Sequence, residues 1–219
     1  MLLLAATAAL FICWQQPDTA LLRKYRAGNR LAEWIYAQLQ FPAAGPSAKA
    51  ALLQQAAANA WRAPQTHAEI QAWQDLLINQ GYTLLQSGDI ISSTDAYQQA
   101  FEWGKQHSDI TDPGLVLEYI LKPLGNNYTR LGDYEQALFI HRIALEFARE
   151  LGDKQAMAAT YSNLANTAAN MGQLQQSLQY CHEGMLLADK HSAAYGLLLS
   201  EQADACQQLQ QYGAAKQSI

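Results

Sequence analysis

Three polar side chains in the segment KPLGNNYTR have the types and the spacing of a binding surface. Lys122, Asn126 and Arg130 follow one another at intervals of four residues, so on an α-helix they lie on one face. An asparagine offers two N–H donors and an oxygen acceptor, which match the groups of a peptide backbone. A lysine attracts a carboxylate. The pattern indicates recognition of a peptide and not a catalytic step.

A second polar set lies about 40 residues further along the chain and consists of Asn163, Asn166 and Asn170. We expect the two sets to line one concave surface if their helices stack side by side. The candidate binding residues are Lys122, Asn126, Thr129, Arg130, Asn163, Asn166 and Asn170. The alternative is that these amides hydrogen-bond neighbouring helices to each other and serve only as a scaffold.

The sequence carries no signature of a catalytic centre. It lacks the Gly-x-x-x-x-Gly-Lys phosphate loop, the His-Glu-x-x-His zinc motif and the Gly-x-Ser-x-Gly nucleophile elbow. No two of its three cysteines have Cys-x-x-Cys spacing, which argues against a structural zinc site. We therefore expect no cofactor and no metal, and we expect this chain alone not to be an enzyme.

Composition excludes further classes of function. The 219 residues carry a formal charge of -5, and only 15% of them are charged. A nucleic-acid-binding protein usually presents a basic face, and no cluster of Lys and Arg occurs, so no nucleic acid is expected as a partner. Ala, Leu and Gln dominate while Pro and Gly are sparse, which predicts an all-α protein.

The first residues, MLLLAATAALFICW, form an apolar run that is too short to span a membrane as a helix. We interpret residues 1–17 as a signal peptide or a lipoprotein signal, with a lipid anchor on Cys13 as one form of it. Export to the cell envelope or secretion follows from this interpretation. The alternative is a buried N-terminal helix in a cytoplasmic protein.

Small residues recur at matched positions and reveal an internal repeat. Counted from Gly81 to Gly125, Ala165 and Ala203, the period is 44, 40 and 38 residues, which is typical of stacked helical repeats. We expect each repeat to be a helix, a turn at its second glycine and a second helix, with small residues where helices approach closely. The candidate repeat-packing residues are Gly81, Gly88, Ala100, Gly125, Tyr128, Gly132, Ala137, Ala144, Gly172 and Gly184.

This order of small and aromatic residues resembles the tetratricopeptide repeat (TPR), in the longer form found in kinesin light chain and related peptide-binding arrays. The resemblance implies a right-handed superhelix of stacked helix-turn-helix repeats, an α-solenoid. The repeats are expected at about 74–110, 118–152, 158–190 and 196–219, the last one incomplete, within an array that covers 65–219. Residues 18–64 are expected to form an N-terminal helical pair, which is a degenerate repeat or a cap.

The same register explains the residues that could otherwise suggest metal or thiol chemistry. His141 and Cys181 occupy equivalent packing positions in adjacent repeats, where Tyr97 stands in an earlier one, so we favour core packing over a site formed with His182. A disulfide between Cys181 and Cys206 is an alternative only for an exported protein. Helices are expected at 19–40, 47–61, 67–86, 90–106, 113–131, 134–150, 155–171, 174–190, 192–209 and 212–219.

Two narrower resemblances refine the expected function. KPLGNNYTRLGDYEQAL is similar to the TPR half of bacterial proteins with a C-terminal CHAT domain, a caspase-like peptidase, over 115–190. Lys122, Asn126 and Asn163 also match part of the carboxylate clamp of chaperone-binding TPR proteins, but Leu197 and Glu201 replace its basic residues. We expect a protein–protein interaction module with a protein or peptide ligand, within a larger protein. The alternatives are the sensor half of a CHAT-type peptidase, with its catalytic half beyond Ile219, and a purely structural oligomerisation scaffold.

Overall fold

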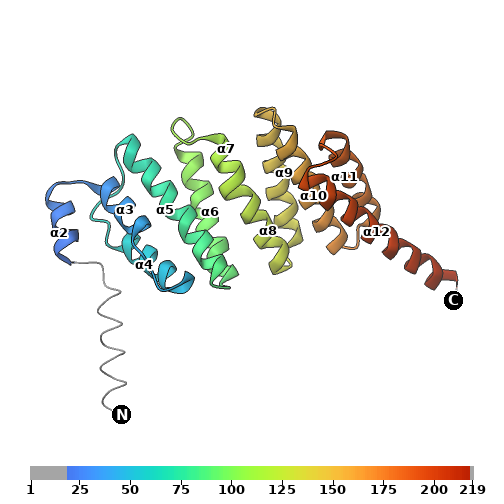
Figure 1. The fold of residues 1–219 in the computed structure, drawn as a ribbon, viewed down its shortest axis with the longest axis horizontal. Helices are drawn as coiled ribbons and strands as arrows, with labels where there is room; N and C mark the ends of the chain where they lie inside the picture. Colours follow the sequence, from blue (N-terminus) through green and yellow to red (C-terminus); the bar gives the residue numbers. More distant parts are fainter. Residues whose placement is uncertain (1–18, 218–219) are drawn as a thin grey trace, which may run out of the picture. The chain divides into compact units, whose positions relative to one another are not determined.

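The computed structural model describes residues 19–217, and all its regular structure there is helical (Figure 1). The expected all-α class is thereby confirmed. The elements are α2 (Thr19–Ala27), α3 (Leu31–Gln40), α4 (Pro46–Ala58), α5 (His67–Gln86), α6 (Ile90–Gln106), α7 (Pro113–Val116), the π-helical turn η1 (Leu117–Leu121), α8 (Lys122–Leu131), α9 (Tyr134–Glu150), α10 (Lys154–Asn170), α11 (Leu174–Leu187) and α12 (Ala193–Gln217). The expected signal segment 1–17, with Cys13, lies outside the described residues.

The chain divides into two compact units, Met1–Thr111 and Asp112–Ile219. The described helices of the first unit are α2 to α6, and those of the second unit are α7 to α12. Within each unit, helices that follow one another in the chain pack against each other. None of the described helices is both long enough and apolar enough to cross a membrane.

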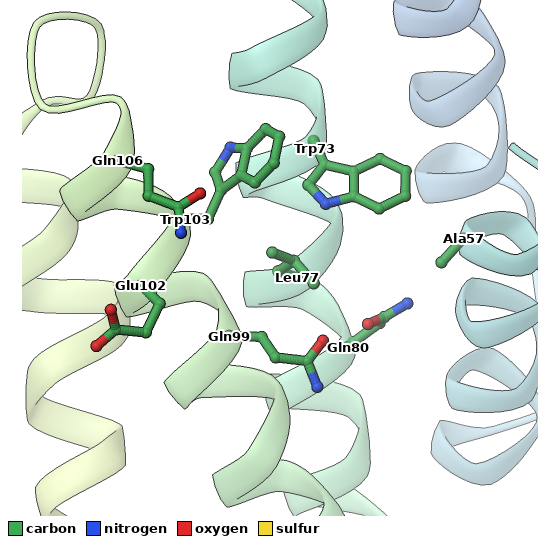
Figure 2. Close-up of a pocket in the computed structure, with 8 residues that line it drawn as sticks. All are labelled: Ala57, Trp73, Leu77, Gln80, Gln99, Glu102, Trp103 and Gln106. Atoms are coloured by element: carbon green, nitrogen blue, oxygen red, sulfur yellow. The ribbon is translucent and has the colours of Figure 1, made fainter. Parts of the chain in front are cut away.

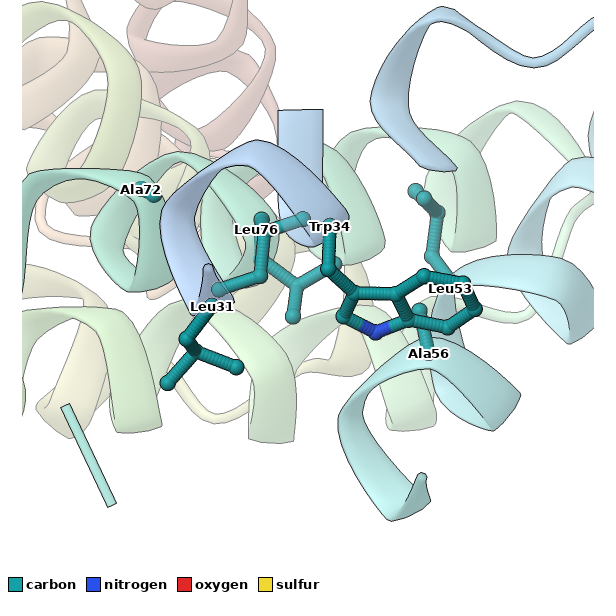
Figure 3. Close-up of a cluster of buried hydrophobic side chains, with 7 residues drawn as sticks. Leu31, Trp34, Leu53, Ala56, Ala72 and Leu76 are labelled. Atoms are coloured by element: carbon teal, nitrogen blue, oxygen red, sulfur yellow. The ribbon is translucent and has the colours of Figure 1, made fainter. Parts of the chain in front are cut away.

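The core of the first unit forms where three helices meet (Figure 3). Leu31, Trp34 and Ile35 of α3 are fully buried there, and they meet side chains from α4 and α5. The partners are Leu53, Ala56, Ala72 and Leu76. Removing these apolar surfaces from water is the main force that holds α3 and α4 to α5.

The core of the second unit links four helices in the same way. Leu138 and Leu145 of α9 pack with Tyr161 and Leu164 of α10, and the cluster continues into α11 and α12. The remaining members are Ala165, Cys181 and Leu198. The first helix of each pair thus contributes to contacts with its own partner helix and with the following pair, as expected for a stacked array.

The predicted turns within the pairs are confirmed at three glycines. Gly88, Gly132 and Gly172 have positive φ angles of 88°, 79° and 75°, and they end α5, α8 and α10. A Cβ atom on any of them would meet nothing within 4 Å. The requirement for glycine at these three positions is therefore the left-handed backbone and not a close approach of helices.

Other small residues do mark close approach of helices. A Cβ atom on Gly81 would lie 2.9 Å from the ring of Tyr97, and one on Gly184 would lie 2.8 Å from Leu198. Gly125 faces the ring of His141 in the same manner. The expected packing residues Ala100, Ala137 and Ala144 are fully buried, whereas Tyr128 is half-buried.

The predicted single helix 113–131 contains an irregularity. Its path runs from α7 through the π turn η1 into α8. Pro123 is the second residue of α8. A proline inside a helix has no N–H to donate to the carbonyl four residues earlier, here that of Tyr119, and its ring crowds that carbonyl. A π turn relieves such crowding by inserting one residue into the helical register, which accounts for its place next to Pro123.

Three expected boundaries are wrong. The helix predicted over 19–40 is broken between α2 and α3, where Asn29 adopts a positive φ of 52° after Gly28. Residues 18–64 therefore hold three helices and not a pair. The break predicted near Gln211 is absent, because α12 continues from Ala193 to Gln217. One helix thus covers 193–217, where two helices and a turn were expected.

Candidate functional site

The seven candidate binding residues lie on the first helices of two successive pairs in the second unit. Lys122, Asn126, Thr129 and Arg130 belong to α8, and Asn163, Asn166 and Asn170 belong to α10. We call this set the polar stripe. The side chains of Asn126, Arg130 and Asn170 are exposed, and the others are partly buried.

A pair of threonines joins the two halves of the polar stripe. The hydroxyl oxygen of Thr129 lies 3.0 Å from that of Thr167, within hydrogen-bond distance. Each hydroxyl also lies close to a carbonyl oxygen of its own helix, that of Gly125 at 3.1 Å and that of Asn163 at 2.8 Å. The polar faces of α8 and α10 are therefore adjacent in the structure.

The polar stripe continues onto α12 through an amide–carboxylate contact. Asn166 Nδ2 donates to Glu201 Oε1 at 3.1 Å. Asn170 Nδ2 in turn donates to the Asn166 carbonyl oxygen at 3.0 Å and to Asn166 Oδ1 at 3.1 Å. Two of the predicted ligand-binding amides are thus engaged within the protein. Only the bond of Asn166 to Glu201 joins two helices, as the scaffold alternative expects, while the bonds of Asn170 stay within α10.

Lys122 is also engaged in the structure. Its ammonium group forms an ion pair with the carboxylate of Glu118, one turn earlier. The Lys122 side chain is 18% exposed and that of Glu118 is 46% exposed. An acidic ligand would have to compete with Glu118 for this lysine. Asn126 and Arg130, one and two turns further on, remain open to solvent.

Burial and neighbouring charge shift the pKa values of Glu201 and Cys181, next to the polar stripe. Burial raises the pKa of the Glu201 carboxyl above its usual value, and the charge of Asp204 adds to this, against the hydrogen bond from Asn166. Burial likewise raises the pKa of the Cys181 thiol to about 11, with a further contribution from Glu201. A thiol with such a pKa stays protonated at neutral pH and is a poor nucleophile.

The histidine and cysteine residues singled out in the sequence differ in their exposure to solvent. His141 and Cys181 are fully buried, while His182 is exposed. Burial lowers the pKa of His141 to about 4, so its ring is neutral at pH 7. Cys181 and Cys206 are free thiols. Among the side chains that the structure describes, no group of three or more His, Cys, Asp or Glu residues is placed to hold a metal ion.

A pocket of about 290 Å³ in the first unit was not predicted from the sequence (Figure 2). It lies over α5, with Ala57 of α4 on one side and Glu102 of α6 on the other. Its other lining residues are Trp73, Leu77, Gln80, Gln99, Trp103 and Gln106. The rings of the two tryptophans are 6.1 Å apart between centroids. The signal for it is the pair of tryptophans on the two helices of one repeat.

A second depression, of about 340 Å³, lies between the segment before α4 and the end of α5. Phe41 and Tyr82 are exposed aromatic residues in its lining. Lys49 in this lining is committed to the protein, because its ammonium group donates to the carbonyl oxygens of Gln38, Leu39 and Phe41 at 3.0, 2.7 and 2.6 Å. These bonds satisfy carbonyl groups at the C-terminal end of α3.

Sequence comparison with known proteins finds one partial relative. No protein-family model matches the chain. Over 102 residues, 47% of the chain, the sequence is 28% identical to G-protein-signaling modulator 1 of Homo sapiens. The matched part is 14% of that protein, so the chain spans only a small fraction of the length of this relative.

Two solved structures resemble the chain over most of its length. BtubC (BKLC) from P. vanneervenii matches with a TM-score of 0.55 and 13% identity, over 95% of this chain and 91% of that one. A putative kinesin light chain from Podospora anserina, with nearly identical TPR-like repeats, matches with a TM-score of 0.56 and 13% identity, over 90% and 88%. The chain therefore has a TPR-like repeat fold, as the sequence predicted.

Proposed function

We propose that this chain binds an extended peptide segment of a partner protein along the polar stripe. A TPR-like repeat fold is generally a protein-interaction module, and the chain shares its fold with the kinesin light chain structure that carries TPR-like repeats. The proposal is carried by one observation, the continuity of polar side chains across α8, α10 and α12. The contacts Thr129–Thr167 and Asn166–Glu201 link α8 to α10 and α10 to α12.

The exposed members of the polar stripe suit the recognition of a peptide backbone. Asn126 presents an amide to solvent in the middle of α8, and Arg130 presents a guanidinium one turn later. The half-buried Asn163 lies on α10, one turn before Thr167, which contacts Thr129 of α8. Amide side chains can pair with both the N–H and the C=O groups of an extended chain, which gives affinity without dependence on the ligand's side chains.

The experiment is a selection of random 12-residue peptides on phage against the purified chain, followed by titration of synthetic binders. We expect Asn126→Ala/Asn163→Ala to weaken binding by about 1–3 kcal/mol, the cost of removing buried amide hydrogen bonds. The matched control is Gln175→Ala/Gln179→Ala, which removes two exposed amides from α11, the second helix of its pair. Equal affinity of the wild type and the stripe variant would overturn this site assignment.

The bond of Asn166 to Glu201, which joins α10 to α12, favours one competing function, a structural scaffold. A scaffold would self-associate without a ligand, and its stripe variants would lose stability instead of affinity. Sedimentation velocity over a range of protein concentrations separates the two functions. A monomer that selects peptides supports the interaction module.

The segment KPLGNNYTRLGDYEQAL resembles the TPR half of CHAT-domain proteins, which favours a further role as the regulatory part of a CHAT-type peptidase in a larger protein. This role adds a partner domain to the interaction module and does not change the stripe. The test is to determine the reading frame past the codon for Ile219 and to assay the 219-residue chain for peptide hydrolysis. We expect no hydrolysis by this chain alone, and hydrolysis by it would overturn the role.

A further inference from the structure

Glu201 differs in its surroundings from the other carboxylates of the second unit. It lies on α12, next to the polar stripe, and its side chain is partly buried. Its Oε1 accepts one hydrogen bond, from the neutral amide of Asn166. The amide oxygen of Asn166 accepts in turn from Asn170 Nδ2, which also donates to the Asn166 backbone carbonyl.

Among the side chains that the structure describes, those of residues 20–210, no basic group pairs with this carboxylate. The ion pairs of the second unit there are Lys122 with Glu118 and Arg149 with Glu146, and neither involves Glu201. The titratable groups that act on Glu201 are Asp204 on its own helix and Cys181 on α11. The first repels a second negative charge, and the second is a buried neutral thiol.

A partly buried carboxylate whose hydrogen-bond donor is a single neutral amide carries a negative charge that no positive charge balances. Removing a charge from water costs free energy, which a neutral hydrogen bond offsets only in part. A cation at hydrogen-bond distance restores the balance and forms a charge-assisted bond about twice as strong as a neutral one. Since the surface beside it is the proposed peptide site, the missing cation is best supplied by the ligand.

We propose that Glu201 is a subsite for a cationic group of the bound peptide, an ammonium or a guanidinium. The inference rests on the proposed function and specifies its ligand: a peptide that lies across α8 and α10 and places a positive charge at α12. Asn166 would act as a positioning residue that fixes the carboxylate. Lysine side chains, arginine side chains and a free peptide N-terminus share this chemistry, and the experiment separates them.

The probes are the synthetic 12-residue peptides from the phage selection, acetylated at the N-terminus and amidated at the C-terminus. In each binder every lysine is replaced in turn by norleucine and every arginine by citrulline, which keep the size and remove the charge. We expect one replacement to weaken binding to the wild type by about tenfold or more, the usual effect of losing a charged hydrogen bond. A further arm compares acetylated with free N-termini.

Glu201→Gln decides whether that preference belongs to this carboxylate. We expect the variant to bind the charged and the neutral peptide within about twofold of each other, while Glu183→Gln, an exposed carboxylate on α11, keeps the wild-type preference. Urea unfolding of both variants checks that they are folded. Binders without any preference for a cation, or a preference that persists in Glu201→Gln, would overturn the subsite but leave the interaction module standing. A selection without binders would contradict both.

Discussion

The imidazole ring of His141 lies directly against the backbone of Gly125, so a residue without a side chain joins the two helices of one repeat. A Cβ atom on Gly125 would lie 2.5 Å from His141 Nδ1. The same spacing of 16 residues places Gly81 against Tyr97. In the next repeat it relates Ala165 to Cys181, and both are buried in one cluster. The two large rings thus face glycines, whereas the smaller Cys181 is paired with an alanine.

Gly125→Ala is therefore expected to destabilise the second unit. The added methyl group would overlap a ring that is fully buried and cannot move aside. Overpacking of this kind costs about 1–3 kcal/mol. The measurement is the free energy of unfolding in urea, followed by far-UV circular dichroism.

A compensating variant tests whether the clash with His141 is the cause. Gly125→Ala/His141→Cys reproduces the Ala165–Cys181 combination that the next repeat contains. We expect the double variant to be more stable than Gly125→Ala alone. If the second substitution lowers the stability further, the two residues do not interact as the structure shows.

The buried His141 predicts a dependence of stability on pH. Burial lowers its pKa to about 4 from 6.5 in the unfolded chain. The neutral ring is favoured in the folded state, so this contribution is complete above pH 6.5 and is lost as the pH falls towards 4. A shift of this size corresponds to about 3 kcal/mol. Urea unfolding at several pH values between 7 and 4 measures it.

His141→Tyr is the control for this titration, because Tyr97 occupies the equivalent position opposite Gly81. We expect the variant to lose the histidine contribution and to show a flatter stability profile between pH 6.5 and 4. A profile as steep as that of the wild type would assign the pH dependence to other groups.

The sequence predicted those features of the fold that recur at the same position in each repeat. The turns at Gly88, Gly132 and Gly172, the small residues at close helix crossings and the position of the polar stripe on first helices all follow from small residues at matched positions. Their causes are local, since a left-handed turn or a close helix crossing requires glycine or alanine whatever surrounds it.

Features that depend on tertiary partners were beyond the sequence. The bond of Asn166 to Glu201 depends on how α10 packs against α12, and it competes with a ligand for a polar group. The ion pair of Lys122 with Glu118 competes in the same way, but it is a local i,i+4 contact along the helix. The continuous α12 was missed because the repeat pattern of helix, turn and helix places a turn near Gln211, although the glutamines around it favour a helix. The pocket beside Trp73 needs the positions of three helices at once.

Glu69 is expected to be a main source of stability at the start of α5. Its carboxylate accepts hydrogen bonds from Arg62 at 2.9 and 2.6 Å and from the backbone N–H groups of Gln65 and Thr66. The hydrogen bond from Arg62 is the chief cause that lowers the pKa of Glu69 to about 2. Thr66 completes a capping box by accepting from the Glu69 N–H.

Glu69→Gln should lower the free energy of unfolding by about 1–3 kcal/mol, because it removes charged hydrogen bonds from a buried group. The contribution of the wild-type carboxylate is present above pH 4.5 and is lost as the pH falls towards 2. Glu33→Gln is the matched control: it breaks the exposed ion pair with Arg30, which should cost below about 1 kcal/mol. Similar losses for both variants would contradict the special role of Glu69.

The two described cysteines should differ sharply in reactivity. Cys206 is exposed and Cys181 is buried, with a pKa raised to about 11 mainly by burial. At pH 8 only about a thousandth of such a thiol is ionised, and the thiolate is the reactive form. In a Cys13→Ser variant, titration with Ellman's reagent at pH 8 should therefore show one fast thiol, and Cys206→Ser should abolish this phase. The second thiol should react at the rate of unfolding and become fast in urea. Two fast thiols in the native protein would show that the α10–α11–α12 core opens far more readily than its packing indicates.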